Sequence, residues 1–115
     1  MRIHKAVGRL LLHGADMKSD FEEQEKMLHR RIGEVLHYVW DPIGVAAVPQ
    51  ARDEYDSYTA PVFALLNAGA SEAEICTYLD RLATDWMGLG DTLLLSKKAA
   101  SVLVNWRDFA TELTR

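Results

Sequence analysis

The chain lacks most of the features that mark a catalytic or membrane protein. It has one cysteine, Cys76, so no internal disulfide can form and a reducing compartment is the simpler expectation. No apolar run approaches the roughly 20 residues that a membrane-spanning helix needs, which predicts a soluble protein with no membrane partner. Together with the reducing compartment, this indicates a cytoplasmic protein. No nucleophile is paired with a base, and no strand leads into a glycine-rich phosphate loop. The sequence therefore contains no catalytic signature.

Positive charge is also scarce. The chain has 13 Lys and Arg against 17 Asp and Glu, a net charge of −4. Residues 1–16 carry a net charge of +2, so residues 17–115 carry −6. This balance disfavours nucleic acid as a partner, because proteins that bind phosphates cluster Lys and Arg. It is compatible with a basic protein partner.

The 115 residues, 49% of them hydrophobic and 26% charged, are enough for one folded domain. We expect residues 17–115 to form it. Residues 1–16 are a basic amphipathic extension, predicted to form a short helix that packs on the domain or on a neighbouring copy. The apolar run 10–12 is too short for the core of a signal peptide.

Hydrophobic periodicity predicts an all-α fold of four principal helices. Ser19 and Glu22 have the spacing of a capping box, which predicts a helix start. Pro42 disfavours the helical conformation at Asp41, so this helix should end near Trp40. The apolar face of the first helix is predicted to comprise Leu28, Ile32, Val35, Leu36 and Val39.

The second helix is expected to start near Ala51, after an ordered loop at 42–50. Pro61 removes a backbone amide and crowds the carbonyl of Ser57, so this helix should be kinked or be two short helices that meet near Thr59. Its apolar face is predicted to comprise Tyr55, Tyr58, Val62, Leu65 and Leu66.

Turn and capping signals delimit the last two helices. Gly69 can end the second helix, and Ser71 with Glu74 forms a second capping box. Gly88 and Gly90 break the third helix, and Asp91 is predicted to cap the fourth. The third apolar face comprises Ile75, Tyr78, Leu79, Leu82 and Trp86, and the fourth Leu95, Ala99, Val102, Trp106, Phe109 and Leu113. No segment alternates like a strand, so we expect a compact bundle or orthogonal array.

The Trp-Asp-Pro segment at 40–45 reads as a rigid corner. A large indole at the end of an apolar stripe most often covers one end of a core, so Trp40 is assigned there. The Asp41 carboxylate can accept bonds from nearby backbone amides in an Asx-type turn. Gly44 suits a backbone with positive φ.

The segment 52–58 has two interpretations. Its acids can be the negative charges favoured in a first helical turn, with its two tyrosines facing the core. It can instead be a recognition surface, because tyrosine and arginine are frequent in binding hot spots and carboxylates steer a basic partner. The predicted partner-binding residues are Asp41, Arg52, Asp53, Glu54, Tyr55, Asp56 and Tyr58.

Other chemistry has weaker support in the sequence. His37 and Asp41 are four residues apart, with Asp53 or Glu54 brought near by the loop, but no second histidine completes a metal motif. We therefore predict no metal, no cofactor and no catalytic residue. His29 and His37 are expected at the solvent edge. Cys76 should be an inert thiol, because nearby glutamates oppose the helix dipole.

Four segments of the chain resemble a group of short bacterial proteins that share a domain of unknown function. The resemblance rests on WDPIGV at 40–45, RDEYDSY at 52–58, GASEAEICTYL at 69–79 and MGL at 87–89. It extends over residues 30–106, with Trp106 similar to the group's terminal tryptophan. Similar proteins are found beside polymorphic toxin genes, which implies an immunity role. The group has no accepted catalytic residues.

Three hypotheses follow for the function. The leading one is a small protein-binding module without catalytic activity, an immunity protein that neutralises a basic toxin through an acidic surface. The second is a small-ligand- or metal-binding protein, or a hydrolase, with a pocket at the 37–58 corner. The third is a subunit of a structural homodimer.

Overall fold

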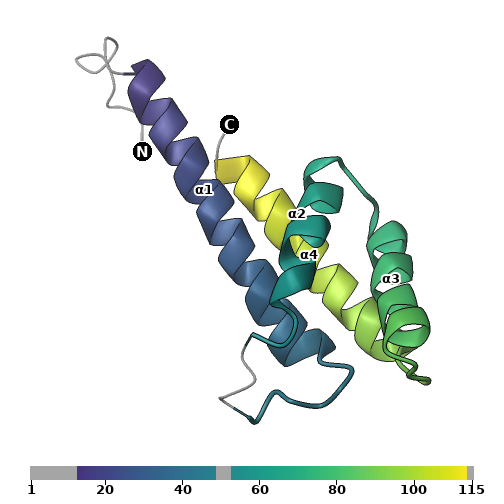
Figure 1. The fold of residues 1–115 in the computed structure, drawn as a ribbon. Helices are drawn as coiled ribbons and strands as arrows, with labels where there is room; N and C mark the ends of the chain where they lie inside the picture. The colour runs from purple at the N-terminus through teal and green to yellow at the C-terminus, as the bar shows by residue number, and fades with distance from the viewer. Residues whose placement is uncertain (1–12, 49–52, 114–115) are drawn as a thin grey trace.

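A computed structural model describes the backbone of residues 13–48 and 53–113, with side chains from Phe21 onward in those ranges. It contains four α-helices, α1 (His13–Val35), α2 (Thr59–Asn67), α3 (Glu72–Arg81) and α4 (Leu93–Leu113). The long helices α1 and α4 pack against each other, and α3 packs along the first half of α4 (Figure 1). The described ranges contain no strand, which confirms the predicted all-α bundle. None of their helices is long and apolar enough to cross a membrane.

The predicted start of the first helix is wrong. Helix α1 begins at His13 and continues through Ser19, so Ser19 does not cap a helix and the expected boundary at 16/17 falls inside α1. Capping-box residues are tolerated in a helix interior, and no proline in 13–18 stops the helix from starting earlier. The short helix predicted for 1–16 falls largely on residues 1–12, which lie outside the described ranges.

The end of the first helix agrees with the prediction but takes a wider form. Residues Leu36–Trp40 make a π-helical turn, η2, closed by a 3.0 Å bond from the Asp41 amide to the Leu36 carbonyl. Asp41 then adopts a left-handed conformation with φ of 35°. Of the predicted apolar face, Val39 is half-buried, and the buried members are Leu28, Ile32, Val35 and Leu36.

Two short helices meet at Thr59, one of the two outcomes expected from Pro61. A 3₁₀ turn, η4 (Asp56–Tyr58), leads directly into α2 at Thr59. Pro61 therefore lies in the first turn of α2, where backbone amides have no partner within the α-helix. The expected helix start near Ala51 is wrong, because residues 53–55 form a turn and the helical backbone begins at Asp56.

The turn between α2 and α3 forms as predicted. Gly69 has a φ of 88°, and the Ser71 hydroxyl accepts the Glu74 amide at 3.1 Å. The Glu74 carboxylate accepts the Ser71 amide in return, at 2.7 Å. From α4, Arg107 donates to the carbonyls of Leu66 and Ala70 at 3.1 and 2.8 Å, which ties this turn to the body of the bundle.

The third helix departs from its predicted stripe at its end. Helix α3 continues into a second π-helical turn, η5 (Leu82–Trp86), which buries Leu82 and Ala83. Trp86 is 80% exposed, so its assignment to the core is wrong. A π turn contains more residues than an α turn, so the side chains after it are rotated away from the stripe that 3.6 residues per turn predicts.

The fourth helix is rotated relative to the prediction. Thr92 directly precedes it, and the Thr92 backbone carbonyl accepts the Ser96 amide at 3.0 Å, so Asp91 does not hold the capping position. Phe109 and Leu113 are about half exposed, at 49% and 48%. The buried residues are Ser96, Ala99, Ala100, Leu103 and Ala110. Small side chains on this face let another helix approach α4 closely, which an apolar-residue pattern does not reveal.

Candidate functional site

The Asp41 carboxylate organises the corner that follows α1. One oxygen, Oδ1, accepts the amides of Gly44 and Val45 at 3.1 and 2.7 Å. The other oxygen, Oδ2, accepts the Ala46 amide at 2.9 Å. The predicted Asx-type role is therefore confirmed, and Gly44 has the expected positive φ, 85°. The carboxylate holds the loop in one direction.

Tyr55 joins this loop to the segment before α2. Its hydroxyl donates to Asp41 Oδ1 at 2.9 Å and accepts the Ile43 amide at 3.1 Å. The side chain is only 2% exposed, so no exposed part of Tyr55 remains for the predicted partner contact. Burial raises the pKa of the Tyr55 phenol above its usual range; the Ile43 amide opposes this shift and Asp41 adds to it. We call the residues 41–46 together with Tyr55 the Asp41 corner.

The raised pKa of Tyr55 predicts a loss of stability at alkaline pH. Above pH 10, the ordinary pKa of tyrosine, the unfolded phenol releases its proton while the folded one keeps it. The free energy of unfolding should then fall by up to about 1.4 kcal/mol per pH unit from this group. Urea unfolding between pH 9 and 11 should show a shallower decline for Tyr55→Phe. Equal slopes in the two proteins would contradict the role of this phenol.

Trp40 connects the Asp41 corner to the core. Its side chain is fully buried, and its ring lies 5.4 Å from that of Tyr55 and 6.2 Å from that of Tyr58. The indole Nε1 donates to Ser96 Oγ at 3.2 Å. This confirms that Trp40 covers one end of the core.

A short polar chain continues from Ser96 into α3. The Ser96 hydroxyl donates to Asp80 Oδ1 at 3.1 Å, and the Thr92 hydroxyl donates to the same oxygen at 2.8 Å. Sequence reasoning missed these residues. The available signal was a serine among the apolar residues of α4, together with a predicted core tryptophan whose N–H needed an acceptor.

The prediction that His37 lies at the solvent edge is wrong, because its side chain is only 1% exposed. The turn η2, to which His37 belongs, packs against α4 and is buried at Leu36, His37 and Trp40. The His37 ring meets Tyr38 edge-on at 4.5 Å, and neither ring nitrogen has a hydrogen-bond partner within the described ranges. Over residues 21–48 and 53–113, no three His, Cys, Asp or Glu side chains are grouped so that they could hold a metal ion.

The exposed charge of the corner lies in one short segment. Asp53, Glu54 and Asp56 are exposed, and we call them the acidic turn. They make no ion pair or side-chain hydrogen bond with any described residue. A 3.1 Å bond from the Asp56 amide to the Asp53 carbonyl shapes the segment. Of the other predicted contact residues, Tyr58 is half-buried and Arg52 lies outside the described ranges.

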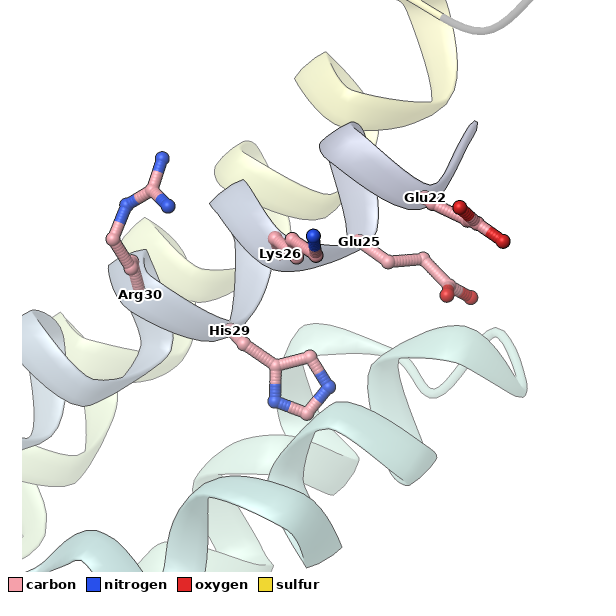
Figure 2. A pocket seen from close by; sticks show the side chains of 5 residues that line it. All are labelled: Glu22, Glu25, Lys26, His29 and Arg30. Carbon is pink, nitrogen blue, oxygen red and sulfur yellow. The ribbon is translucent and has the colours of Figure 1, made fainter. Parts of the chain in front are cut away.

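A hollow of about 480 Å³ lies elsewhere, along α1. Figure 2 shows that its lining side chains all come from this one helix and that Arg30 points away from His29. His29 instead reaches toward α2 and stacks on Phe63, with ring centroids 4.2 Å apart. No second element supplies a polar group to the lining, so this hollow is a charged helix face rather than an enclosed site.

Cys76 is half-buried on α3. Burial raises the pKa of its thiol; the Asp80 carboxylate adds to the shift and Lys97 opposes it. A raised pKa keeps the thiol protonated near neutral pH, where the thiolate is the reactive form. This supports the expectation of an inert thiol.

The comparisons with known proteins supply no relative for this arrangement. No protein-family model, curated protein or solved structure matches the chain. The acidic turn on its buried support is the candidate functional site.

Proposed function

We propose that this chain is a small protein-binding module without catalytic activity, which binds a basic protein through the acidic turn. The proposal rests on a contrast, at one corner of the molecule, between exposed carboxylates and side chains that are bonded internally. The carboxylates of Asp53, Glu54 and Asp56 are exposed and uncompensated by any described residue, whereas Asp41 and Tyr55 beneath them are bonded internally. Clustered carboxylates of this kind steer a basic partner and favour a fast encounter.

The support under the acidic turn favours binding over flexible solvation. Tyr55 lies within the turn and is buried between Trp40 and the Asp41 loop. A recognition segment that is already ordered loses less conformational entropy when it binds. The turn is therefore preorganised for a partner.

The same corner offers apolar contact area. Ile43 and Val48 are 47% and 43% exposed, and the bond between the Ile43 amide and the Tyr55 hydroxyl holds this loop beside the acidic turn. Protein interfaces combine such apolar area with a polar, charged rim. Ile43 and Val48 would supply the apolar area, and the carboxylates of the acidic turn would supply the charged rim.

The resemblance to proteins encoded beside toxin genes supports a particular partner, a basic toxin whose active or substrate-binding surface the module covers. The internal bonding of Asp41 favours this proposal over a ligand pocket at 37–58. Such a pocket would use the Asp41 carboxylate, which already accepts three backbone amides and the Tyr55 hydroxyl.

The proposal predicts that Asp53→Ala/Glu54→Ala weakens partner binding by roughly tenfold or more, mainly through slower association. The partner is first identified by affinity capture from the host and mass spectrometry, and binding is then measured with purified proteins by surface plasmon resonance. The matched control is Glu22→Ala/Glu23→Ala, which removes the same charge from exposed positions on α1. Its affinity should stay close to wild type.

Thermal unfolding separates binding from folding. Both double variants should melt close to the wild type, because exposed substitutions usually change stability by less than about 0.5 kcal/mol. Unchanged affinity together with a lower melting temperature for Asp53→Ala/Glu54→Ala would show that these carboxylates are structural, and the proposal would lose its site.

A further inference from the structure

The connection between α3 and α4 carries the most exposed aromatic side chain of the described residues. Trp86 is 80% exposed, and Leu93 and Leu94, where α4 starts, are 50% and 64% exposed. Single exposed apolar residues are ordinary, but here three large ones flank one short connection, with Trp86 at the end of η5 and Leu93 and Leu94 at the start of α4. Exposed apolar side chains concentrated in this way mark interaction sites. Asp91, Leu93, Leu94 and Lys97 line an open hollow of about 340 Å³ here. We call these four residues and Trp86 the α3–α4 surface.

The outward position of these side chains is built into the backbone. The η5 turn is closed by the Met87 amide on the Leu82 carbonyl at 3.1 Å, and the Leu89 amide bonds the Ala83 carbonyl at 2.9 Å. The start of α4 is pinned on its inner side, where Thr92 donates to Asp80. The exposed tryptophan and leucines are thus held outward by ordered structure.

The charges of this surface suit a second copy of the same chain. In a two-fold interface the same patch of both subunits meets, so if residue i of one subunit contacts residue j of the other, j of the first also contacts i of the second. The patch must therefore be complementary to itself. Asp91 and Lys97 lie on the same hollow as the two leucines, and neither has an ion-pair partner within the described ranges. One acid and one base beside an apolar centre meet the self-complementarity that a two-fold axis requires.

The charge balance near the α3–α4 surface also favours a second copy of the chain as the partner. The whole chain has a net charge of −4, so two copies repel each other over most of their surface. The exposed charged residues of this region are Arg81, Asp85, Asp91, Lys97 and Lys98, with a net charge of +1. Two copies therefore meet less repulsion here than at the acidic turn.

We propose that the chain forms a two-fold symmetric homodimer through the α3–α4 surface. Trp86, Leu93 and Leu94 form its apolar centre, and Asp91 of each protomer pairs with Lys97 of the partner subunit. This interface is separate from the acidic turn, so its presence does not depend on the proposed protein-binding role. A dimer of this kind presents two acidic turns to partners.

Sedimentation equilibrium tests the dimer over roughly 1 µM to 1 mM protein. The wild-type mass should rise from the monomer value of 13.0 kDa toward twice that value. Trp86→Ala/Leu94→Ala should weaken dimerisation at least tenfold. The matched control is Leu113→Ala, which removes a half-exposed leucine at the other end of α4 and should leave dimerisation unchanged.

Charge reversal tests the two-fold pairing itself. Asp91→Lys or Lys97→Asp alone should weaken self-association about tenfold, because like charges then face each other, and the double variant should restore it. The two single variants mixed in equal amounts should also associate, since one then carries only positive and the other only negative charge at these positions. Circular dichroism confirms that each variant is folded.

Three outcomes would overturn the proposal. The first is a monomer at every concentration, and the second is a dimer that survives Trp86→Ala/Leu94→Ala. The third is failure of both the double variant and the mixture to restore association. The first result would assign the exposed apolar residues to a different partner.

Discussion

Trp40→Ala is expected to destabilise the fold by about 3–5 kcal/mol, the largest single-residue effect in this protein. The indole is fully buried, touches both tyrosines of the 52–58 segment and donates to Ser96 on α4. Its removal leaves a cavity where α1, α4 and the Asp41 corner meet. Urea unfolding followed by circular dichroism measures the loss.

Two smaller changes separate packing from hydrogen bonding at this position. Trp40→Phe keeps an aromatic ring but removes the N–H, and Ser96→Ala removes its acceptor together with the donor to Asp80. Each should lower the free energy of unfolding by about 1–3 kcal/mol. The double variant should lose less than the sum, because both changes break the same bond. A loss below about 1 kcal/mol for Trp40→Ala would contradict its place in the core.

Asp41→Ala is expected to destabilise the fold by about 2–4 kcal/mol. The change removes the acceptor of three backbone amides and of the buried Tyr55 hydroxyl, and bonds to a charged group contribute about 1.5–3 kcal/mol each when buried. Partial exposure of the loop amides keeps the total below the sum, since water can replace some of these bonds. Alanine also tolerates the left-handed conformation poorly. Chemical denaturation gives the difference in free energy.

Asp41→Asn and Asp53→Ala serve as controls for this prediction. Asparagine keeps one acceptor oxygen and accepts the left-handed backbone, so its loss should lie between those of wild type and alanine. Asp53 is exposed, and its replacement should change stability by less than about 0.5 kcal/mol. Equal losses for Asp41→Ala and Asp53→Ala would show that Asp41 does not hold the corner.

The corner of the molecule thus has a buried support and an exposed acidic surface. Trp40, Asp41 and Tyr55 determine where the acidic turn lies, and Asp53, Glu54 and Asp56 provide the charge that a partner would meet. Asp41→Ala should therefore weaken partner binding as well as folding, whereas Asp53→Ala/Glu54→Ala should weaken binding alone. Of the seven residues grouped together from the sequence, Asp41 and Tyr55 are bonded within the support, and Asp53, Glu54 and Asp56 are exposed.

Several elements could be predicted because their signals are local. The Ser71–Glu74 capping box, the left-handed Gly69 and the helix end at Trp40 depend on residues within a few positions of one another. Backbone geometry and short-range hydrogen bonds decide such features, so residue type and spacing are sufficient. The all-α class followed from the helical periodicity of the apolar residues.

The errors arose where packing and helix form override local pattern. The π-helical turn at 82–86 moves Trp86 out to solvent, and His37 lies in the interior where η2 packs against α4, although α-helical spacing assigns each the opposite place. The rotation of α4 buries Ser96 and exposes Phe109. Each outcome depends on how closely the helices approach.

Residue spacing alone determines that this chain is helical, where most of its turns lie and that its acids gather near 53–56. Tertiary structure decides which of those residues face solvent. The bond between Asp41 and Tyr55 spans 14 positions, and that between Trp40 and Ser96 spans 56. Such partners are selected by the packing of whole helices, because a side chain's burial and bonds depend on residues that local spacing does not bring into view.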